Sequence, residues 1–494
     1  MSIQKKNKSS ENISRRSFIK TASQISSATL AATAVLYAKT ARSPSNIIFV
    51  ICDQMRGDAL SILGNPNART PNLDAMAESG VLFENSFSNN PVCIPSRKSI
   101  FTGMHPHQHG SLTNNDGSLL PFKDSMMDYF KKRGYRIGWV GKNHTFKKQE
   151  FKNFDSVGIR AREPFRKYSR YVPPHWHGDT YWPDEQCYPK KNTDEAIDFL
   201  RNTKNGEPFF LHVSYFDPHP PYMAPSKFSS QFCSADMKIP EFIEPEVLSG
   251  RLADYARAMG MGKISDTDLT ETMRYYYAAI AWGVDAQIGR LLRALQEQGL
   301  ENNTIVVFTA DHGDFMGHHN MVRKGMFLYD ALLHVPMIWY APGQLPNGRR
   351  VKNLAQGIDI FPTLIDLTGG ERRSDLEGRS LKSVLDGETI NEDGFFIYTS
   401  AGYNELDFQR LEKGVAKDDE TPLHTCVLRQ NMNPKLRTKS IRNRKWKLIM
   451  SESRPLELYH MDGGHIEREN VAKKTEFTDV RGKLEKRLRD WWPW

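Results

Sequence analysis

The feature that most constrains the fold is a set of short, continuous apolar runs that recur along the chain. They lie at residues 47–52 (IIFVIC), 136–140 (RIGWV), 208–214 (PFFLHVS), 304–310 (TIVVFTA) and 335–340 (VPMIWY). Runs of this length without alternating polar positions indicate strands that are buried on both faces. Such strands are typical of parallel sheets that helices cover on both sides.

Helical patterns lie between these runs. Residues 71–79 begin with a proline at a helix start, and residues 120–134 end in basic residues and a glycine, which is typical of a helix C-terminus. Residues 192–203 and 270–299 also predict helices, the second from apolar residues spaced three and four apart. Strands that alternate with helices predict an α/β sandwich with a central, mostly parallel sheet.

The pattern changes after about residue 385. Residues 394–399 and 440–450 predict antiparallel strands, and residues 457–459 predict a further short strand. Residues 475–492 predict an amphipathic closing helix. We therefore expect a main domain over residues 42–384 and a smaller C-terminal α+β subdomain with an antiparallel sheet over residues 385–494.

The N-terminus resembles an export signal. Residues 14–20, SRRSFIK, match the twin-arginine pattern S-R-R-x-F-x-K, and residues 25–38 are apolar but too short and too polar to span a membrane. Cleavage could follow Ala34, Ala38 or Ala41. Residues 1–41 therefore predict a signal peptide, a periplasmic or otherwise exported protein, and the twin-arginine translocase as a partner in export.

The positive charge of the chain comes mostly from this N-terminal segment. The chain has a formal net charge of +9, and residues 1–41 hold seven Lys or Arg against one Glu, which leaves +3 for the remainder. So small a surplus gives no reason to expect a nucleic acid partner. No run of eighteen apolar residues occurs either, so we expect no stable membrane span.

The five cysteines show no C-x-x-C pairing, which argues against a zinc site. Cys52 ends an apolar run and is expected to be a buried thiol. A disulfide among Cys187, Cys233 and Cys426 is compatible with an oxidising compartment, but the sequence does not pair them.

Residues 91–110, PVCIPSRKSIFTGMHPHQHG, carry the most distinctive motif. From Cys93 to Gly103 they read C-x-P-S-R-x-S-x-x-T-G, and seven fixed positions in eleven argue against a chance match. Acidic residues also follow two of the predicted strands, as Asp53-Gln54 and as Asp311-His312. Because the carboxyl ends of parallel strands meet at one edge of a sheet, these residues should converge. Oxygen donors with one imidazole suit Ca²⁺ or Mg²⁺.

Together these motifs resemble the sulfatase family. The order D-Q, C-x-P-S-R, G-K-x-H, D-P-H-x-P, D-H-G-D and then Lys runs from Asp53 to Lys324, and a weaker match around residues 457–470 extends it. The resemblance implies an alkaline-phosphatase-like α/β sandwich, with the sulfatase catalytic domain at residues 42–384. It also implies a bound Ca²⁺, in preference to Mg²⁺, and hydrolysis of a sulfated glycan or another sulfate ester.

The resemblance further implies a role for each motif residue. A formylglycine-generating or maturase enzyme would oxidise Cys93 to formylglycine, whose hydrate supplies the nucleophilic oxygen. The metal ligands would be the matured Cys93 with Asp53, Gln54, Asp311 and His312. Arg97 would hold the hydrate and neutralise charge near the metal. The sulfate and the leaving group would meet Lys142, His144, His219 and Lys324.

One departure keeps two alternatives open. Many sulfatases have Asp-Asp where this chain has Asp53-Gln54, and Gln supplies a neutral oxygen and one negative charge fewer. Relatives that cleave phosphonate or phosphate esters also carry Gln here, whereas Lys142 and His144 favour a sulfatase. The alternatives are a phosphonate monoester or phosphodiester hydrolase with the same nucleophile, and a non-catalytic binder of sulfated glycans.

Other polar residues near the motifs receive lesser roles. We expect Asp314 to start a helix or to contact a metal ligand rather than the metal. Five further histidines should contact the metal ligands or lie in loops rather than bind the metal: His105, His107, His109, His318 and His319. The long loop after residue 154 could form an aromatic platform for sugar rings or simply pack on the core, through Arg166, Tyr168, Trp176, His177 and Trp182.

Overall fold

The computed structural model describes residues 45–114, 119–158, 177–180, 183–204, 206–241, 264–388, 390, 395–402, 437–452, 455–461 and 464–494. The predicted signal peptide at residues 1–41 and Cys426 lie outside the described residues. So do Arg166, Tyr168, Trp176 and Trp182.

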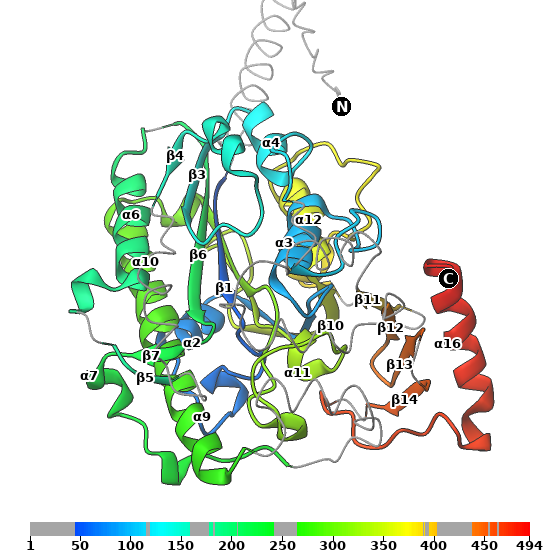
Figure 1. The fold of residues 1–494 in the computed structure, drawn as a ribbon. Coiled ribbons are helices and arrows are strands. Elements are labelled where there is room, and N and C mark those ends of the chain that lie inside the picture. Colours follow the sequence, from blue (N-terminus) through cyan, green and yellow to red (C-terminus); the bar gives the residue numbers. More distant parts are fainter. Residues whose placement is uncertain are drawn as a thin grey trace, which may run out of the picture. The chain divides into compact units, whose positions relative to one another are not determined.

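An eight-stranded sheet forms the centre of the molecule, in the order β10-β2-β9-β8-β1-β6-β3-β4 (Figure 1). Its strands are β1 (Asn46–Asp53), β2 (Val81–Phe87), β3 (Arg136–Gly141), β4 (Ser156–Val157), β6 (Phe209–Pro218), β8 (Thr304–Ala310), β9 (Met337–Tyr340) and β10 (Arg349–Gln356). Only β9 runs antiparallel to its neighbours in this sheet, β2 and β8. The predicted mostly parallel sheet is therefore confirmed.

Helices cover both faces of this sheet, and α6, α9 and α10 lie across it from α3, α4 and α12 (Figure 1). The helices are α2 (Pro71–Glu78), α3 (Cys93–Thr102), α4 (Met126–Lys132), α6 (Tyr188–Arg201), α7 (Ser226–Ser229), α9 (Asp266–Ile280), α10 (Ala286–Glu297), α11 (Asp330–Leu333), α12 (Ile360–Leu367), α13 (Lys382–Leu385) and α16 (Thr478–Trp491).

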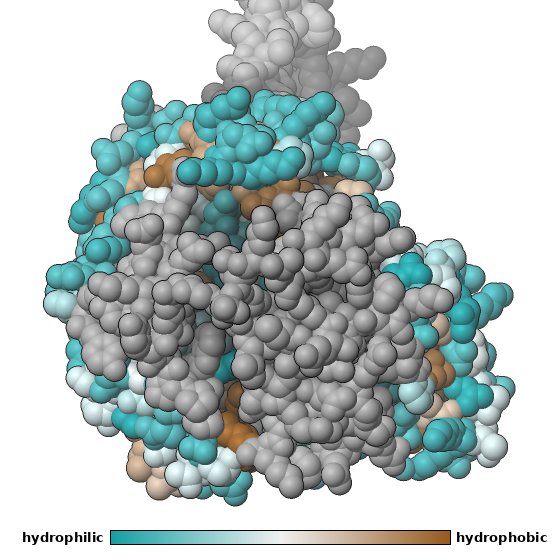
Figure 2. Space-filling view, viewed as in Figure 1, coloured by the Kyte–Doolittle hydropathy of each residue, from teal (hydrophilic) through white to brown (hydrophobic). Residues whose placement is uncertain are grey.

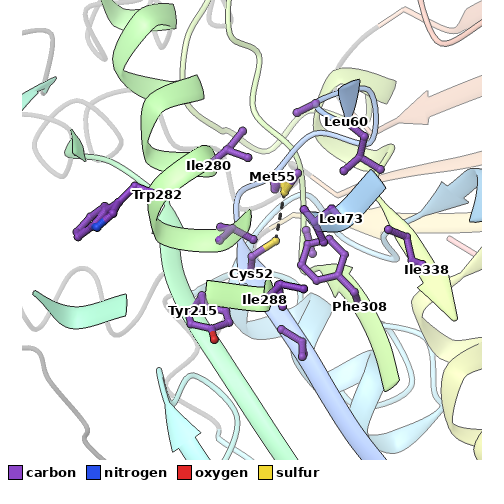
Figure 3. Packing of buried hydrophobic residues seen from close by; sticks show 14 of the residues in the cluster. Cys52, Met55, Leu60, Leu73, Tyr215, Ile280, Trp282, Ile288, Phe308 and Ile338 are labelled. Atoms are coloured by element: carbon purple, nitrogen blue, oxygen red, sulfur yellow. Dashed lines mark hydrogen bonds between the residues drawn. The ribbon is translucent and has the colours of Figure 1, made fainter. Parts of the chain in front are cut away.

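Strand β1 shows why a continuous apolar run suits the centre of such a sandwich. Its alternate side chains Ile48, Val50 and Cys52 join one core cluster, which Figure 3 shows around Cys52 and Phe308. Ile47, Phe49 and Ile51 join the cluster on the opposite face. Full burial of each large apolar side chain contributes about 1.5–3 kcal/mol, so both faces of β1 favour the same position in the fold.

A second, smaller sheet lies in the C-terminal part. Its antiparallel strands run in the order β11 (Ile397–Ala401), β12 (Thr438–Arg442), β13 (Trp446–Ser451) and β14 (Glu457–His460). Leu484 and Leu488 of α16 pack on this sheet in a core cluster of its own. The predicted antiparallel C-terminal sheet and closing helix are therefore confirmed. A two-stranded parallel pair, β5 (His177–Asp179) and β7 (Tyr222–Ala224), lies apart from both sheets.

Several local predictions were wrong. The run at residues 335–340 was expected to be parallel, but β9 is antiparallel, because an apolar run reports burial on both faces and not strand direction. The helix expected at 120–134 is only α4, because Leu120 instead bridges to Phe146 and Ser125 caps the helix. By contrast, the helix expected at 270–299 is present as α9 and α10, which a π turn, Ala281–Asp285, joins.

The remaining features of the fold concern the surface, the apolar character of the helices and the cysteines. Hydrophilic side chains cover much of the coloured surface in Figure 2, and Ile239 is the one large apolar side chain that is strongly exposed among the described residues. No described helix is long and apolar enough to cross a membrane. Cys52 is buried, as predicted, and no disulfide joins the described Cys187 and Cys233.

Candidate active site

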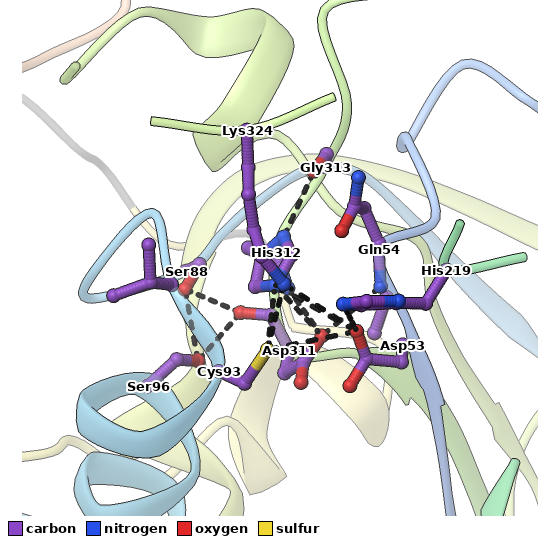
Figure 4. Close-up of polar contacts among 12 residues, drawn as sticks. Asp53, Gln54, Ser88, Cys93, Ser96, His219, Asp311, His312, Gly313 and Lys324 are labelled. Atoms are coloured by element: carbon purple, nitrogen blue, oxygen red, sulfur yellow. Dashed lines mark hydrogen bonds and ion pairs between the residues drawn. The ribbon is translucent and has the colours of Figure 1, made fainter. Parts of the chain in front are cut away.

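The motif residues meet at the carboxyl ends of the central strands. Asp53 is the last residue of β1, Asp311 and His312 follow β8, and Cys93 is the first residue of α3 (Figure 4). One candidate ligand atom from each of these four residues lies within 4.8 Å of the others, and all four residues are buried. The predicted convergence at one edge of the sheet is therefore present.

The Cys93 thiol lies in a strongly cationic environment. Its Sγ atom is 2.8 Å from Lys324 Nζ, 3.2 Å from His312 Nε2 and 4.0 Å from Lys142 Nζ. Burial and the Asp53 carboxylate oppose ionisation of the thiol, but these three cations hold its pKa well below the usual value. Its position at the N-terminus of α3 adds a further partial positive charge. Any nucleophile at this position would be stabilised as an anion.

Arg97 lies one helical turn after Cys93 and is fully buried. Its Nε donates to Asp311 Oδ2 at 2.7 Å, and its Nη2 lies 3.3 Å from Asp53 Oδ2. A third donor, Nη1, binds Ser214 Oγ at 2.7 Å. Arg97 therefore neutralises the two carboxylates, which is one of the two roles implied for it, while its contact with the nucleophile stays a prediction.

Lysine and histidine side chains occupy the other sides of Asp53. Lys142 Nζ donates to Asp53 Oδ2, and Lys324 Nζ lies 3.8 Å from Asp53 Oδ1. Burial alone would raise the pKa of Asp53, but Lys142, Lys324 and His219 hold it well below its usual value. Burial, with Lys142, lowers the pKa of His144 to about 4, although a hydrogen bond to Cys93 acts in the opposite direction.

The His219 side chain is 24% exposed, against 17% for Lys324 and 7% for Lys142. Its Nδ1 lies 2.7 Å from the Pro220 carbonyl oxygen, so Nδ1 carries the proton of the neutral ring. Its Nε2 then faces Asp53 Oδ1 at 4.0 Å. His219 and Lys324 therefore line the more open side of the cluster.

The residues present fit a hard divalent cation. Gln54 Oε1 is buried and accepts no hydrogen bond among the described residues, whereas Gln54 Nε2 donates to Asp314 Oδ2 at 2.7 Å. His312 Nδ1 lies 2.8 Å from the Gly313 carbonyl oxygen, which turns Nε2 toward the cluster. Two carboxylates, an amide oxygen and an imidazole are donors that Ca²⁺ or Mg²⁺ accepts, whereas several thiolates or imidazoles would favour a softer metal.

Gln54 itself has a left-handed backbone, with φ of 69°. A glutamine in this region carries a backbone strain of about 1–3 kcal/mol, which persists only where neighbouring contacts hold it. Its main-chain N–H donates to Asp311 Oδ1 at 3.1 Å, which provides one such contact.

The structure also shows supporting residues that sequence reasoning missed or assigned otherwise. Ser96 donates through Oγ to the Asp311 carbonyl oxygen at 2.5 Å, and Ser88 Oγ does the same at 2.6 Å. Asp314 does not start a helix but contacts the candidate metal ligand Gln54, which is the other of the two roles expected for it. The serine at the fourth position of the C-x-P-S-R motif was the one local signal for such a role.

The five further histidines lie outside the ligand cluster found among the described residues. His105 and His107 pack against Trp491 with ring centroids 5.0 and 4.6 Å away. The others contact Ser99, Arg56 and Tyr329, and they are His109, His318 and His319. His105, His107 and His109 lie outside helices and strands, whereas His318 and His319 lie in a short 3-10 helix, His318–Asn320. His177, from the long loop, stacks on Tyr275 at 5.2 Å.

The α/β sandwich with its mostly parallel central sheet is that of the alkaline-phosphatase-like superfamily, to which sulfatases belong. The chain belongs to the sulfatase family, whose model matches residues 45–370. It is 32% identical over 385 residues to an arylsulfatase of Clostridium perfringens, an alignment that covers 69% of this chain and 78% of that protein. The chain is accordingly a sulfuric ester hydrolase.

Two solved structures support the same fold. The phosphonate monoester hydrolase of Agrobacterium radiobacter superposes with a TM-score of 0.73 at 23% identity, covering 90% of this chain and 95% of that one. A protein in complex with its substrate D-glucosamine-2-N,6-O-disulfate superposes with a TM-score of 0.71 at 23% identity, covering 90% of this chain and 97% of that one. At these identities the likeness concerns the fold and not the substrate.

Proposed function

We propose that the chain is an exported sulfatase that hydrolyses sulfate monoesters of carbohydrates, with Cys93 matured to formylglycine and a bound Ca²⁺. Residues 42–384 form the catalytic domain in this proposal, and residues 385–494 form the C-terminal subdomain. The observation that carries it is the position of Cys93, whose Sγ lies within 4.0 Å of Lys324, His312 and Lys142 beside the Asp53 carboxylate.

Two groups that the chain does not encode complete the site. Formylglycine at position 93 supplies a hydrated aldehyde as the nucleophile, and its second hydroxyl allows sulfate to leave by carbon–oxygen cleavage. A divalent cation held by Asp53, Gln54, Asp311 and His312 supplies charge that stabilises the sulfuryl oxygens. The orphaned Gln54 Oε1 supports such a cation, and the low pKa of the encoded Cys93 thiol supports an anionic oxygen at the same place.

The encoded residues place positive charge around the transferred group. A sulfate monoester carries one negative charge spread over three oxygens, and attack at sulfur moves charge onto the bridging oxygen. Lys142 and Lys324 are fixed by Asp53 and need no rearrangement to meet that charge. Preorganised charges in a buried site stabilise a transition state far more than charges in water do.

The residue that protonates the leaving group should lie on the more open side of the cluster, which His219 and Lys324 line. His219 presents Nε2 there, because its Nδ1 is engaged with the Pro220 carbonyl oxygen. The exposed fraction of this side chain allows a bulky alcohol to approach it while the sulfuryl group reaches Cys93. His219 is therefore assigned to the leaving oxygen, which it protonates from Nε2 when both ring nitrogens carry a proton. Burial and Lys324 lower the pKa of this ring, whereas the Asp53 carboxylate acts in the opposite direction. Lys324 binds both a sulfuryl oxygen and the bridging oxygen.

The second candidate function is that of a phosphonate monoester or phosphodiester hydrolase, and Gln54 is the residue that supports it. Its neutral amide leaves two carboxylates in the ligand set where Asp-Asp would give three. A sulfate monoester, a phosphonate monoester and a phosphodiester all carry one negative charge, so charge alone does not separate them. Lys142 and His144 both lie beside Cys93, and this pair of side chains favours the sulfate ester.

Three substrates distinguish these candidates. Protein matured by a formylglycine-generating or maturase enzyme is assayed with an aryl sulfate, an aryl phosphonate monoester and an aryl phosphodiester, with Cys93→Ala as the inactive control. We expect the highest kcat/KM for the sulfate, and a large preference for either phosphorus ester would overturn the assignment. An active-site thiol that stays unmodified in the native host would favour a non-catalytic glycan binder. Sulfated mono- and oligosaccharides then identify the sugar.

Export is tested separately from catalysis. Residues 14–20 support passage through the twin-arginine translocase into the periplasm or beyond. Replacing Arg15 and Arg16 together by lysine should leave the precursor in the cytoplasm, as detected by cell fractionation. Unchanged export of this variant would remove the translocase from the proposal.

A further inference from the structure

Asp314 is a buried carboxylate that binds neither Cys93 nor its cationic neighbours in any contact found among the described residues. It is fully buried and lies two residues after His312. Its Oδ2 accepts hydrogen bonds from Gln54 Nε2 at 2.7 Å and from Tyr222 OH at 2.6 Å. Its Oδ1 accepts two main-chain N–H groups at 2.9 and 2.8 Å, from Met316 and Arg323. Four donors fill the acceptor capacity of an ionised carboxylate.

These contacts decide which end of the Gln54 amide faces the ligand cluster. The oxygen and the NH₂ group of an amide have nearly the same shape, so hydrogen-bond partners determine its orientation. An ionised carboxylate can only accept, and it therefore takes the NH₂ group. Figure 4 shows the amide oxygen of Gln54 on the side of Asp53 and His312. That oxygen is the buried atom for which the described residues provide no donor.

We propose that Asp314 is a positioning residue that holds Gln54 with its oxygen toward the divalent cation. The inference rests on the proposed metal site, and it adds a residue that touches neither the metal nor the substrate. Without Asp314 the amide could turn and present two N–H donors to a cation, which would repel it.

The same carboxylate fixes the segment that carries Lys324. Asp314 Oδ1 accepts the N–H of Arg323, which has a left-handed backbone with φ of 69°. Lys324 follows directly, and its Nζ reaches Cys93 Sγ at 2.8 Å. Asp314 therefore connects a candidate metal ligand with a candidate sulfate-binding lysine, and its loss should affect both.

An isosteric substitution reverses the hydrogen bonding without changing the volume. In Asp314→Asn, the main-chain donors of Met316 and Arg323 keep Oδ1 as an acceptor, so Nδ2 replaces Oδ2 opposite Gln54. The Gln54 amide must then turn its oxygen to this new donor and its NH₂ group to the cation. Gln54→Glu alone places a carboxylate against the Asp314 carboxylate. The double variant Gln54→Glu with Asp314→Asn restores one donor facing one acceptor and leaves a carboxylate oxygen for the cation.

Calcium binding by the full-length, matured protein tests this pattern. Isothermal titration with Ca²⁺ alone should give a Kd raised about 10- to 100-fold in Asp314→Asn, as is typical when a partner of a metal ligand is lost. Gln54→Glu should also bind more weakly, and the double variant should bind within about threefold of the wild type. Tyr222→Phe is the matched control, because it removes a hydrogen bond to the same Asp314 oxygen without reversing Gln54, and it should leave Kd within about threefold.

The outcomes separate this inference from the proposed metal site. Wild-type protein that binds neither Ca²⁺ nor Mg²⁺ would remove the metal site and the positioning role together. Wild-type binding with an unchanged Kd in Asp314→Asn would overturn the positioning role alone. The positioning role would also be overturned if Tyr222→Phe bound Ca²⁺ as weakly as Asp314→Asn does. The same holds if the double variant bound Ca²⁺ no more tightly than the two single variants. Circular dichroism and urea unfolding identify any variant that has lost the fold. If Asp314→Asn has lost it, comparison of the Kd of Gln54→Glu with that of the double variant tests the positioning role.

Discussion

Lys447 provides the sharpest stability prediction, because it joins the C-terminal sheet to α11 inside the protein. It lies on β13 and is 1% exposed, and its Nζ donates at 2.6 Å both to Asp330 Oδ1 of α11 and to Glu467 Oε1. Burial lowers the pKa of Lys447 to about 8, so the ammonium group still carries its charge at pH 7. Lys447→Met keeps the length and bulk of the side chain but removes that charge.

The size of the effect follows from the geometry. The two carboxylate oxygens lie no more than about 5 Å apart, because each is 2.6 Å from the same nitrogen. At an effective dielectric constant of about 20, two unit charges at that distance repel by about 3 kcal/mol. Loss of one partner from a buried ion pair costs about 3–5 kcal/mol. Arg442 still contacts Asp330, so we expect the free energy of unfolding to fall by about 3 kcal/mol.

Urea unfolding at pH 7.5, followed by tryptophan fluorescence, measures this difference. Lys445→Met is the matched control, since Lys445 lies two residues earlier and is exposed, and it should change the free energy of unfolding by less than about 0.5 kcal/mol. Adding Glu467→Gln to Lys447→Met should recover at least half of the loss, because it removes the second uncompensated carboxylate. A loss below about 1 kcal/mol in Lys447→Met, or no recovery in the double variant, would refute the reasoning.

Three further predictions concern catalysis, metal and pH. Lys142→Ala and Lys324→Ala should each lower kcat/KM for an aryl sulfate by about two to four orders of magnitude, with unchanged circular dichroism, and near-normal turnover would contradict their assignment. EDTA should abolish turnover, and Ca²⁺ should restore it better than Mg²⁺; activity that survives chelation would remove the metal from the account. Burial, with His107, lowers the pKa of His105 to about 3, so the unfolded chain binds the additional proton below about pH 6.5. The contribution of His105 to the free energy of unfolding should therefore be constant above pH 7. It should fall by up to about 1.4 kcal/mol per pH unit between pH 6 and 4. Urea titrations of a His105→Gln variant should lack this part of the pH dependence.

Burial was readable from the sequence, whereas strand direction was not. The run at 47–52 predicted β1 correctly, because both of its faces need apolar cover and only a central strand provides it. The run at 335–340 carries the same signal, yet β9 is antiparallel. Strands β2 and β10 were missed, because polar residues interrupt VLFENSF and RRVKNLAQ, and these strands lie toward one edge of the sheet.

The candidate site was predictable to the extent that it consists of motif residues. Asp53, Asp311 and His312 converge as their places at strand ends predicted, and Cys93 joins them as the family resemblance implied. A contact between Asp314 and a metal ligand was one of two expectations, but its role as acceptor for Gln54 was not predictable, since it depends on the orientation of an amide 260 residues away along the chain. Spacing along a sequence shows which residues approach one another, but not which hydrogen bond each of them makes.

The maturation of Cys93 is the claim on which the rest of the account depends. Mass spectrometry of the tryptic peptide that ends at Arg97, taken from fully active enzyme, tests it directly. The account predicts that the cysteine sulfur has been replaced by the carbonyl oxygen of formylglycine, in proportion to the specific activity of the preparation. An unmodified thiol in fully active enzyme would contradict the account.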